Sequence, residues 1–384
     1  MNQWRVFREF LWLGCISFGG PAAHIGYFHR RFVTRLQWLD DDAFAQLLAL
    51  TQFLPGPASS QLGFAIGHRR AGLGGGLAAF AGFTLPSFVL MVAVALYATR
   101  LPAVWLAGLV DGLKMLAVVV VADAVLSLGG RFCRQPVTRA LALATAVLVW
   151  WWPGIAAQLL ALLSAALVGS VWLGGDPRPD APRAHGARVG RWSLLAYVLL
   201  WGALWGVAGG DGPAALARDF YSAGALVFGG GHVVLPLLQG LVGESVNADT
   251  FLTGYAAAQA MPGPMFSLAA YLGAVLSPGA AWWGALLATL AIFLPGFLLV
   301  LGLGDVWRAL AARPRLAGAV AGINATVVGL LLAALYQPVF LSSVAGPRDL
   351  AVVVLGFAAL RSGRVPLLVL VPVMAASGLL VALW

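Results

Sequence analysis

Long apolar segments, separated by short polar ones, run along almost the whole chain. A helix needs roughly 20 apolar residues to cross about 30 Å of hydrocarbon, and most of these segments approach that length. The pattern predicts an all-α polytopic membrane protein in which two of the segments are short enough to pair as a hairpin. The segments lie near 72–99, 103–128, 138–153, 154–173, 193–209, 282–302, 316–336, 349–361 and 365–383.

Composition agrees with this pattern, because 61% of the 384 residues are hydrophobic and only 10% are charged, against roughly 25% charged in a soluble domain. The net charge of +9 comes from arginines that stand singly or in pairs between apolar segments. We interpret them as topology signals and expect no nucleic-acid partner. Cys15 and Cys133 have no ligand residues at metal-binding spacing, so neither a disulfide nor a metal or other cofactor is expected. The apolar start of the chain has no cleavage site, which indicates a retained segment.

Four landmarks occur twice in the same order, at a spacing of 207 to 210 residues. Such an internal repeat predicts two homologous folds. We divide the chain into a first repeat (1–173), a linker with one connecting span (174–209) and a second repeat (210–384). The landmarks are "CISFGGPAAHI" at 15–25 and "ALVFGGGHVVL" at 225–235, the Pro-Gly-Pro elements of "TQFLPGPASSQLG" at 51–63 and "AQAMPGPMFSLAA" at 258–270, Pro86 and Pro295, and the segments 106–115 and 316–325.

Positive charges are distributed oppositely in the two repeats, and short loops rich in Lys and Arg stay in the cytoplasm. Equivalent loops of the second repeat near 238–249 and 276–281 have no Lys or Arg. The second repeat is therefore predicted to be inverted, with the N-terminus and the arginine-rich linker in the cytoplasm. Inverted repeats are typical of secondary transporters. The arginines concerned are Arg30, Arg31, Arg35, Arg69, Arg70, Arg131, Arg134 and Arg139 in the first repeat, and Arg308, Arg313 and Arg315 in the second.

The Pro-Gly-Pro elements interrupt apolar sequence, and the flanking arginines make 10–29 and 42–67 re-entrant hairpins in this interpretation. A helix that begins after Pro-Gly-Pro has free backbone N–H groups and the positive end of its dipole, which together favour an anion. We expect residues 56–61 and 263–268 to be half-helix N-termini that face an anion from opposite sides of the bilayer. Candidate donors and close-approach positions are Gly56, Ser59, Ser60, Gln61, Gly263 and Ser267, joined by the Phe-Gly-Gly residues Gly19, Gly20, Gly229 and Gly230.

Charged and titratable residues within the spans are few, and such residues are candidates for function. Lys114, the only lysine, follows Asp111 by three residues, and Asn324 is its counterpart. Two interpretations stay open: a counter-ion or proton relay, and a structural ion pair. His24 and His232 follow the Phe-Gly-Gly breaks and are candidates for proton coupling because histidine titrates near neutral pH.

With these residues in view, the chain resembles the chromate ion transporter family in its long, two-domain form. The resemblance is carried by "FGGPAAHIGYF", "QFLPGPASSQLGFAIGHRRAG", "FGGGHVVLPLL" and "AQAMPGPMFSLAAYLG". It implies efflux of chromate with chromate resistance, sulfate as a competing or exchanging oxyanion, and two antiparallel domains in the cytoplasmic membrane. By position in these motifs, the functional residues implied are Gly19, Gly20, Pro21, Arg30, Gln52, Pro55, Gly56, Pro57, Ser59, Gln61, Gly229, Gly230, Gln259, Pro262, Gly263 and Pro264. Gly231 departs from the pattern, since it stands where the first repeat has Pro21.

Two rival functions stay open beside an oxyanion carrier. A membrane phosphatase acting on lipid phosphates would need a carboxylate or histidine as nucleophile or base, and residues 51–67 and 258–273 contain no charged residue or histidine. An oxyanion channel would use the same anion site. The absence of a phosphate-binding G-x-x-x-x-G-K-[ST] motif disfavours a primary pump. A homodimer is left open by the sequence.

Overall fold

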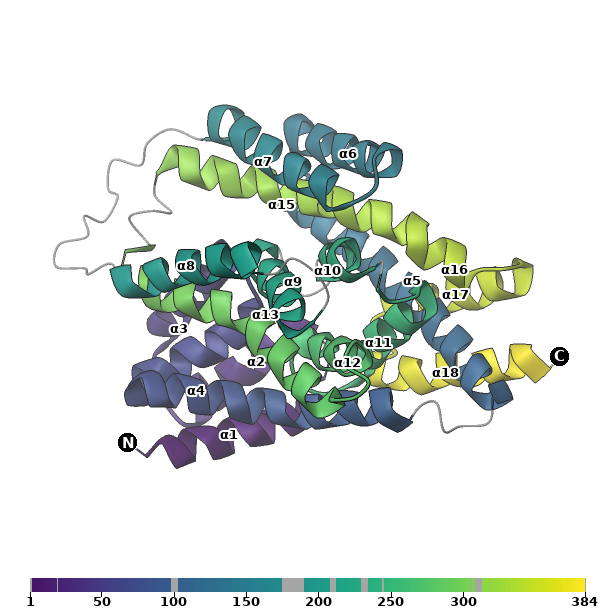
Figure 1. The fold of residues 1–384 in the computed structure, drawn as a ribbon, viewed down its shortest axis with the longest axis horizontal. Coiled ribbons are helices and arrows are strands. Elements are labelled where there is room, and N and C mark those ends of the chain that lie inside the picture. The colour runs from purple at the N-terminus through teal and green to yellow at the C-terminus, as the bar shows by residue number, and fades with distance from the viewer. Residues whose placement is uncertain are drawn as a thin grey trace.

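The structure is a computed structural model, and it describes residues 2–18, 20–97, 103–174, 190–207, 212–228, 234–243, 245–304, 306–307 and 313–383. Most residues in these ranges are helical, and none of them is in a strand (Figure 1). Three described helical segments are long and apolar enough to cross a membrane, judged by length and composition. They are Ala58–Tyr97, Ala281–Leu303 and Pro314–Ser343. The predicted all-α membrane fold is confirmed.

The first repeat runs through seven α-helices and one π-helix. Their order is α1 (Gln3–Ile16), α2 (Gly20–Phe28), the π-helix η1 (His29–Arg35), α3 (Asp41–Phe53), α4 (Ala58–Tyr97), α5 (Ala103–Phe132), α6 (Pro136–Trp151) and α7 (Ile155–Trp172).

The connecting helix α8 (Arg191–Val207) leads into the second repeat, whose helices follow the same order. They are α9 (Pro213–Leu226), α10 (Val234–Val242), α11 (Ala248–Ala260), the 3-10 helix η4 (Met265–Ser267), α12 (Leu268–Val275), α13 (Ala281–Leu303), α15 (Pro314–Ala334), η5 (Leu335–Phe340), α16 (Leu341–Ser343), α17 (Pro347–Arg361) and α18 (Leu367–Leu383).

Helices α1 and α2 form an antiparallel hairpin that continues through η1. Phe10 stacks on Phe32 at 4.7 Å and meets Phe28 edge-on at 5.5 Å between ring centroids. Glu9 accepts a bond of 2.8 Å from Nε of Arg31. These pairs place the tip of the hairpin at Ser17, where the apolar sequence breaks.

Helix α4 contains a second hairpin, because its backbone bends sharply at Ala71 and Gly72. Gly67 and Gly75 lie so close across this bend that a Cβ on either would collide with the carbonyl oxygen of the other. The chain therefore turns back between two helical segments, as the separation of the 42–67 and 72–99 segments predicts. Gly273 and Gly284 make the same approach where α12 turns back into α13.

The two repeats interlock through their long helices. Helix α5 packs mainly on α18 and α17 of the second repeat, whereas α15 packs mainly on α7 and α6 of the first. Figure 1 shows α6, α7 and α15 along one edge of the molecule, with α18 beside α5. Glycine pairs permit both contacts, because small residues let helices in membranes approach closely. The pairs are Gly169 with Gly318 and Gly108 with Gly378. The equivalent contacts fit homologous repeats, while the inverted orientation and the repeat boundaries stay predictions.

Replacement of Gly273 by valine should destabilise the protein by about 1–3 kcal/mol, because the new side chain overpacks the turn between α12 and α13. Thermal unfolding of the detergent-purified protein measures this loss. Gly130→Ala is the matched control, since nothing lies within 4 Å of a Cβ at Gly130. Equal melting temperatures for the Gly273→Val variant and the wild type would contradict the close packing.

Candidate functional site

Two backbone hydrogen bonds join the broken segments of one repeat to those of the other. Gly56 N–H donates to the Val227 carbonyl oxygen at 2.7 Å, and Gly263 N–H donates to the Ser17 carbonyl oxygen at 2.9 Å. Ser17 and Val227 are 210 residues apart, and each lies just before a Phe-Gly-Gly element. Each Pro-Gly-Pro element is thus tied to the Phe-Gly-Gly region of the opposite repeat. We call these two places the Gly56 crossing and the Gly263 crossing.

Glycine is required at both crossings by conformation and by space. The φ angle is +120° at Gly56 and +100° at Gly263, a region that side chains with a Cβ rarely adopt. A Cβ on Gly56 would lie 3.1 Å from Gly296 Cα, and one on Gly263 would lie 3.0 Å from Ser87 Oγ. Gly296 and Ser87 each follow an equivalent proline of α13 or α4. Each crossing therefore includes a third segment.

A helix resumes directly after each Pro-Gly-Pro, as predicted. Gln61 N–H donates to the Pro57 carbonyl oxygen at 2.9 Å, and Ser267 N–H donates to the Pro264 carbonyl oxygen at 2.9 Å. The amides that precede these first helical bonds have no partner within their own helix. Anion donors at this place would be those amides, because the Gly56 and Gly263 amides already bind carbonyl oxygens.

Serine hydroxyls without a partner accompany these helix starts. The exposed fraction is 2% for Ser60, 1% for Ser267 and 0% for Ser17, and in the described part of the chain none of the three hydroxyls has a hydrogen-bond partner. Burying such a group unpaired costs about 1–3 kcal/mol. The hydroxyls are therefore available to a polar ligand. Ser59 is also buried.

Gln61 acts as a brace between the repeats. Its side chain is fully buried, and Nε2 donates to the carbonyl oxygens of Pro55 at 2.8 Å and Gly296 at 3.2 Å. Both donor hydrogens thus face backbone, and only the acceptor Oε1 has no partner among the described residues. The sequence contained no signal for the contact with Gly296.

The two glutamines before the Pro-Gly-Pro elements lie in different surroundings. Gln52 is exposed and accepts a 2.7 Å hydrogen bond from Arg131 Nη2. Gln259 is buried, and its Nε2 contacts the sulfur of Met265 at 2.6 Å. Gln259 therefore lies at the Pro-Gly-Pro break of its repeat, whereas Gln52 faces Arg131 in the last turn of α5.

His24 lies at the tip of the first hairpin and is fully buried. Its Nε2 is 3.2 Å from the Ser17 carbonyl oxygen, the same oxygen that Gly263 binds, and its ring meets Phe83 edge-on at 5.2 Å. Gly20, with φ of +72°, begins α2, and Pro21 follows it in the first turn. Four further predicted residues lie outside the described part of the chain: Gly19, Gly229, Gly230 and His232.

Lys114 pairs with both repeats. Its Nζ lies 3.4 Å from Asp111 Oδ1 and 2.6 Å from Asp249 Oδ1. The lysine side chain is 8% exposed and the two carboxylates are 59% and 64% exposed. Two carboxylates already balance the ammonium charge, which favours the structural interpretation over a counter-ion for substrate. The partner Asp249, in the first turn of α11, could not be identified from sequence spacing.

The counterpart Asn324 is buried in α15, and in the described structure its Oδ1 has no partner. Arg30 is exposed, and its guanidinium lies 5.2 Å from the Tyr27 ring centroid. Neither residue touches the crossings in the contacts described here.

Gly56→Ala should destabilise the protein more than Gly154→Ala. Both glycines have φ near +120°, but only Gly56 has close neighbours, since nothing lies within 4 Å of a Cβ at Gly154. The pair of variants separates backbone strain from close approach. Equal decreases in melting temperature for the two variants would contradict the close contacts of Gly56 with its neighbours.

Lys114→Met should lower thermal stability by about 3 kcal/mol or less, because two partly exposed carboxylates lose their partner. The exchanged double variant Lys114→Asp with Asp249→Lys should recover part of the loss, since opposite charges again face each other. If the double variant is less stable than both Lys114→Asp and Asp249→Lys alone, the result would argue against a direct ion pair between Lys114 of α5 and Asp249 of α11.

The family model described as "Chromate transporter" matches residues 4–170 and again residues 214–381. A chromate transport protein of Pseudomonas aeruginosa is 30% identical, over 86% of this chain and 80% of its own length. A probable chromate transport protein of Synechococcus elongatus is 28% identical, over 86% of this chain and 83% of its own. A chromate transport protein of Cupriavidus metallidurans is 26% identical, over 86% and 81%. No solved structure matches.

The family and these relatives are transporters, which sets the phosphatase aside. The two matched regions correspond to the two halves in which the landmarks recur. The resemblance recognised in the sequence is confirmed, and this chain belongs to the chromate transporter family.

Proposed function

We propose that this chain is a secondary transporter that exports chromate across the cytoplasmic membrane and also accepts sulfate, which competes or exchanges. The N-terminus is cytoplasmic in this proposal, and export confers chromate resistance. The observation that carries it is the pair of reciprocal bonds from Gly56 to Val227 and from Gly263 to Ser17, because they bring a helix start of each repeat to the break of the other.

The binding chemistry follows from the groups at these helix starts. Free amides at the positive end of a helix favour an anion, and the hydroxyls of Ser60 and Ser267 are buried beside them in sequence without a partner in the described structure. Neutral donors bind a tetrahedral oxyanion without the penalty of burying a full opposite charge. A site of this kind holds the ion and also releases it.

The conformational change that we propose follows from the segments that meet at the two crossings. Each crossing is made by both repeats, so a rocking motion of the α1–α4 segment against the α9–α13 segment changes both crossings together, while the interlocked long helices α5 and α15 stay with their partners. Transporters with repeated halves alternate access by such motion around a midplane site. Lys114 and Asp249 join α5 to α11, and we assign this pair to holding the two repeats in register.

The two crossings differ in chemistry, which supports unequal affinity in the two access states. Gln61 fills the Gly56 crossing with an amide that binds two carbonyl oxygens. At the Gly263 crossing the histidine His24 binds the Ser17 carbonyl oxygen, and Ser87 Oγ would be 3.0 Å from a Cβ on Gly263.

The membrane potential suffices as a driving force. When the cytoplasm is negative, each negative charge that leaves it releases about 2.3 kcal/mol of free energy per 100 mV. A dianion therefore releases roughly 4 to 5 kcal/mol at 100 mV. Efflux by this route needs no nucleotide hydrolysis.

Chromate flux in proteoliposomes of the purified full chain tests the proposal. We expect flux that saturates with chromate, follows an imposed potential and accelerates when sulfate is present on the opposite side. Ser60→Ala and Ser267→Ala should each raise the half-saturating concentration several-fold, since a neutral hydrogen bond contributes about 0.5–1.5 kcal/mol.

The control is Ser170→Ala, whose hydroxyl bonds the carbonyl oxygen of Leu167 in its own helix at 2.7 Å. It should leave the half-saturating concentration unchanged. Flux that does not saturate and ignores opposing sulfate would indicate a channel, and no flux under any gradient would refute the proposal.

A further inference from the structure

A small basic cavity lies between α1 and η1. Its volume is about 190 Å³, and Arg30, Arg31 and Arg35 line it together with the rings of Trp12 and Tyr27. Pockets for drug-sized ligands are larger, about 300–1,000 Å³, so this cavity fits a small ion.

The positive charge around this cavity is mostly uncompensated. Arg31 bonds Glu9 through Nε and Nη2 and lies 4.8 Å over the Trp12 ring. Arg30 contacts only the Tyr27 ring in the interactions described for it. Within the described chain neither Arg30 nor Arg35 takes part in an ion pair. Three guanidinium groups thus share one carboxylate.

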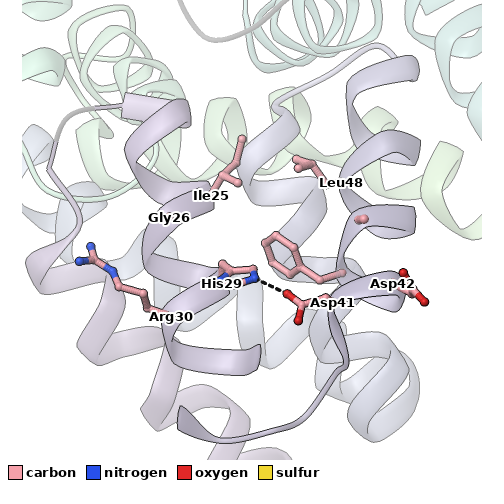
Figure 2. A pocket seen from close by; sticks show the side chains of 9 residues that line it. Ile25, Gly26, His29, Arg30, Asp41, Asp42 and Leu48 are labelled. Atoms are coloured by element: carbon pink, nitrogen blue, oxygen red, sulfur yellow. Dashed lines mark hydrogen bonds and ion pairs between the residues drawn. The ribbon is translucent and has the colours of Figure 1, made fainter. Parts of the chain in front are cut away.

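A neighbouring cavity on the other side of η1 has the opposite character. Figure 2 shows His29 pointing toward Asp41, with a hydrogen bond of 2.7 Å, and Asp42 beside them. Arg30 also lines this cavity, but in Figure 2 its guanidinium extends away from the aspartates. The aspartates disfavour an anion there, and the arginines favour one on the α1 side.

The basic cavity and the Gly263 crossing are adjacent along α1. Ile16 is one of the residues that line the cavity, and the next residue, Ser17, provides the carbonyl oxygen that Gly263 binds. An ion held by the arginines is therefore one residue along the chain from the segment that forms the proposed binding site.

The second repeat lacks this feature. At a spacing of 210 residues, the three arginines correspond to Gly240, Leu241 and Ser245. Leu241 and Ser245 line a larger cavity of about 490 Å³, whose basic residue Arg218 bonds Asp219 at 2.7 Å. Only the first repeat has a cavity of excess positive charge among those described.

We propose that Arg30, Arg31 and Arg35 form a capture site that draws a dianionic tetrahedral oxyanion from the cytoplasm toward the Gly263 crossing. This inference rests on the proposed function and adds a residue-level route of entry. A guanidinium presents a rigid fork of donors that matches oxyanions, and a cleft lined by one sign of charge raises the local concentration and the association rate of its substrate. Capture on one side only favours binding from that side and release on the other.

Positive charge that merely fixes topology would not need this arrangement. The positive-inside rule counts charges in short loops and is satisfied equally by lysine. The contacts of Arg30 with Tyr27 and of Arg31 with Trp12 orient the guanidinium groups, and their forked donors suit an oxyanion. The phosphate of an anionic lipid has the same chemistry, and the experiment must separate it from the free ion.

The test measures chromate uptake by everted membrane vesicles, in which the cytoplasmic face is outside, for the full chain at low ionic strength. The Arg30→Gln, Arg35→Gln double variant should raise the half-saturating chromate concentration roughly tenfold with little change in maximal rate, because steering is lost. The difference should shrink at 1 M salt, where the Debye length falls to about 3 Å. In right-side-out vesicles the double variant should match the wild type.

Two controls are matched to this change. Arg69→Gln removes an exposed arginine from the turn region of α4 and should leave the half-saturating concentration unchanged. The Arg30→Lys, Arg35→Lys variant keeps the charge and the topology and should give an intermediate value, because lysine lacks the fork.

The outcomes separate the capture site from the proposed function. Wild-type uptake with an unchanged half-saturating concentration in the glutamine double variant overturns the capture site and leaves the transporter intact, whereas no wild-type uptake overturns the transporter. Loss of maximal rate alone also overturns capture. So does an effect confined to reconstituted vesicles that contain phosphatidylglycerol and absent from pure phosphatidylcholine, because the occupant would then be a lipid phosphate.

Discussion

Two backbone hydrogen bonds, from Gly56 to Val227 and from Gly263 to Ser17, join the broken segments of this protein. Backbone that leaves helical geometry in a membrane must find other partners, because unsatisfied N–H and C=O groups cost several kcal/mol there. Each Pro-Gly-Pro element satisfies part of this need with a carbonyl group of the opposite repeat. Neither repeat therefore satisfies these two amides by itself, and the two crossings exist only where both repeats are present.

Close packing of small residues makes these bonds geometrically feasible. The Gly56 crossing depends on Gly296 and the Gly263 crossing on Ser87, which leave room for the backbone to approach. Aromatic rings pack each resumed helix against α13: Phe64 of α4 stacks on Phe297 at 4.5 Å, and Phe266 of η4 lies 5.9 Å from Phe293. Polar donors are thus presented within an apolar, tightly packed surrounding, in which electrostatic interactions are strong.

Local features of the site could be predicted from the sequence because proline and glycine act on their own backbone. The restart of a helix after Pro57 and after Pro264 and the turn near residue 71 follow from residues within a few positions. Partners from the opposite repeat could not be predicted in this way. The contact of Gln61 with Gly296 and that of Lys114 with Asp249 depend on packing between segments that are far apart in sequence. For the same reason the two glutamines Gln52 and Gln259, alike in sequence position, have unlike surroundings.

The exchange of helices between the repeats has a consequence for how the protein is made. Helix α15 packs mainly on α6 and α7, and α5 packs mainly on α17 and α18, which follow it by more than 200 residues. During synthesis the first repeat is made before the second. Until the second repeat follows, only lipid or a chaperone can cover the surface of α5. Final assembly must therefore wait until α17 and α18 have left the ribosome, so a ribosome that stops after the first repeat leaves α5 without its main partners.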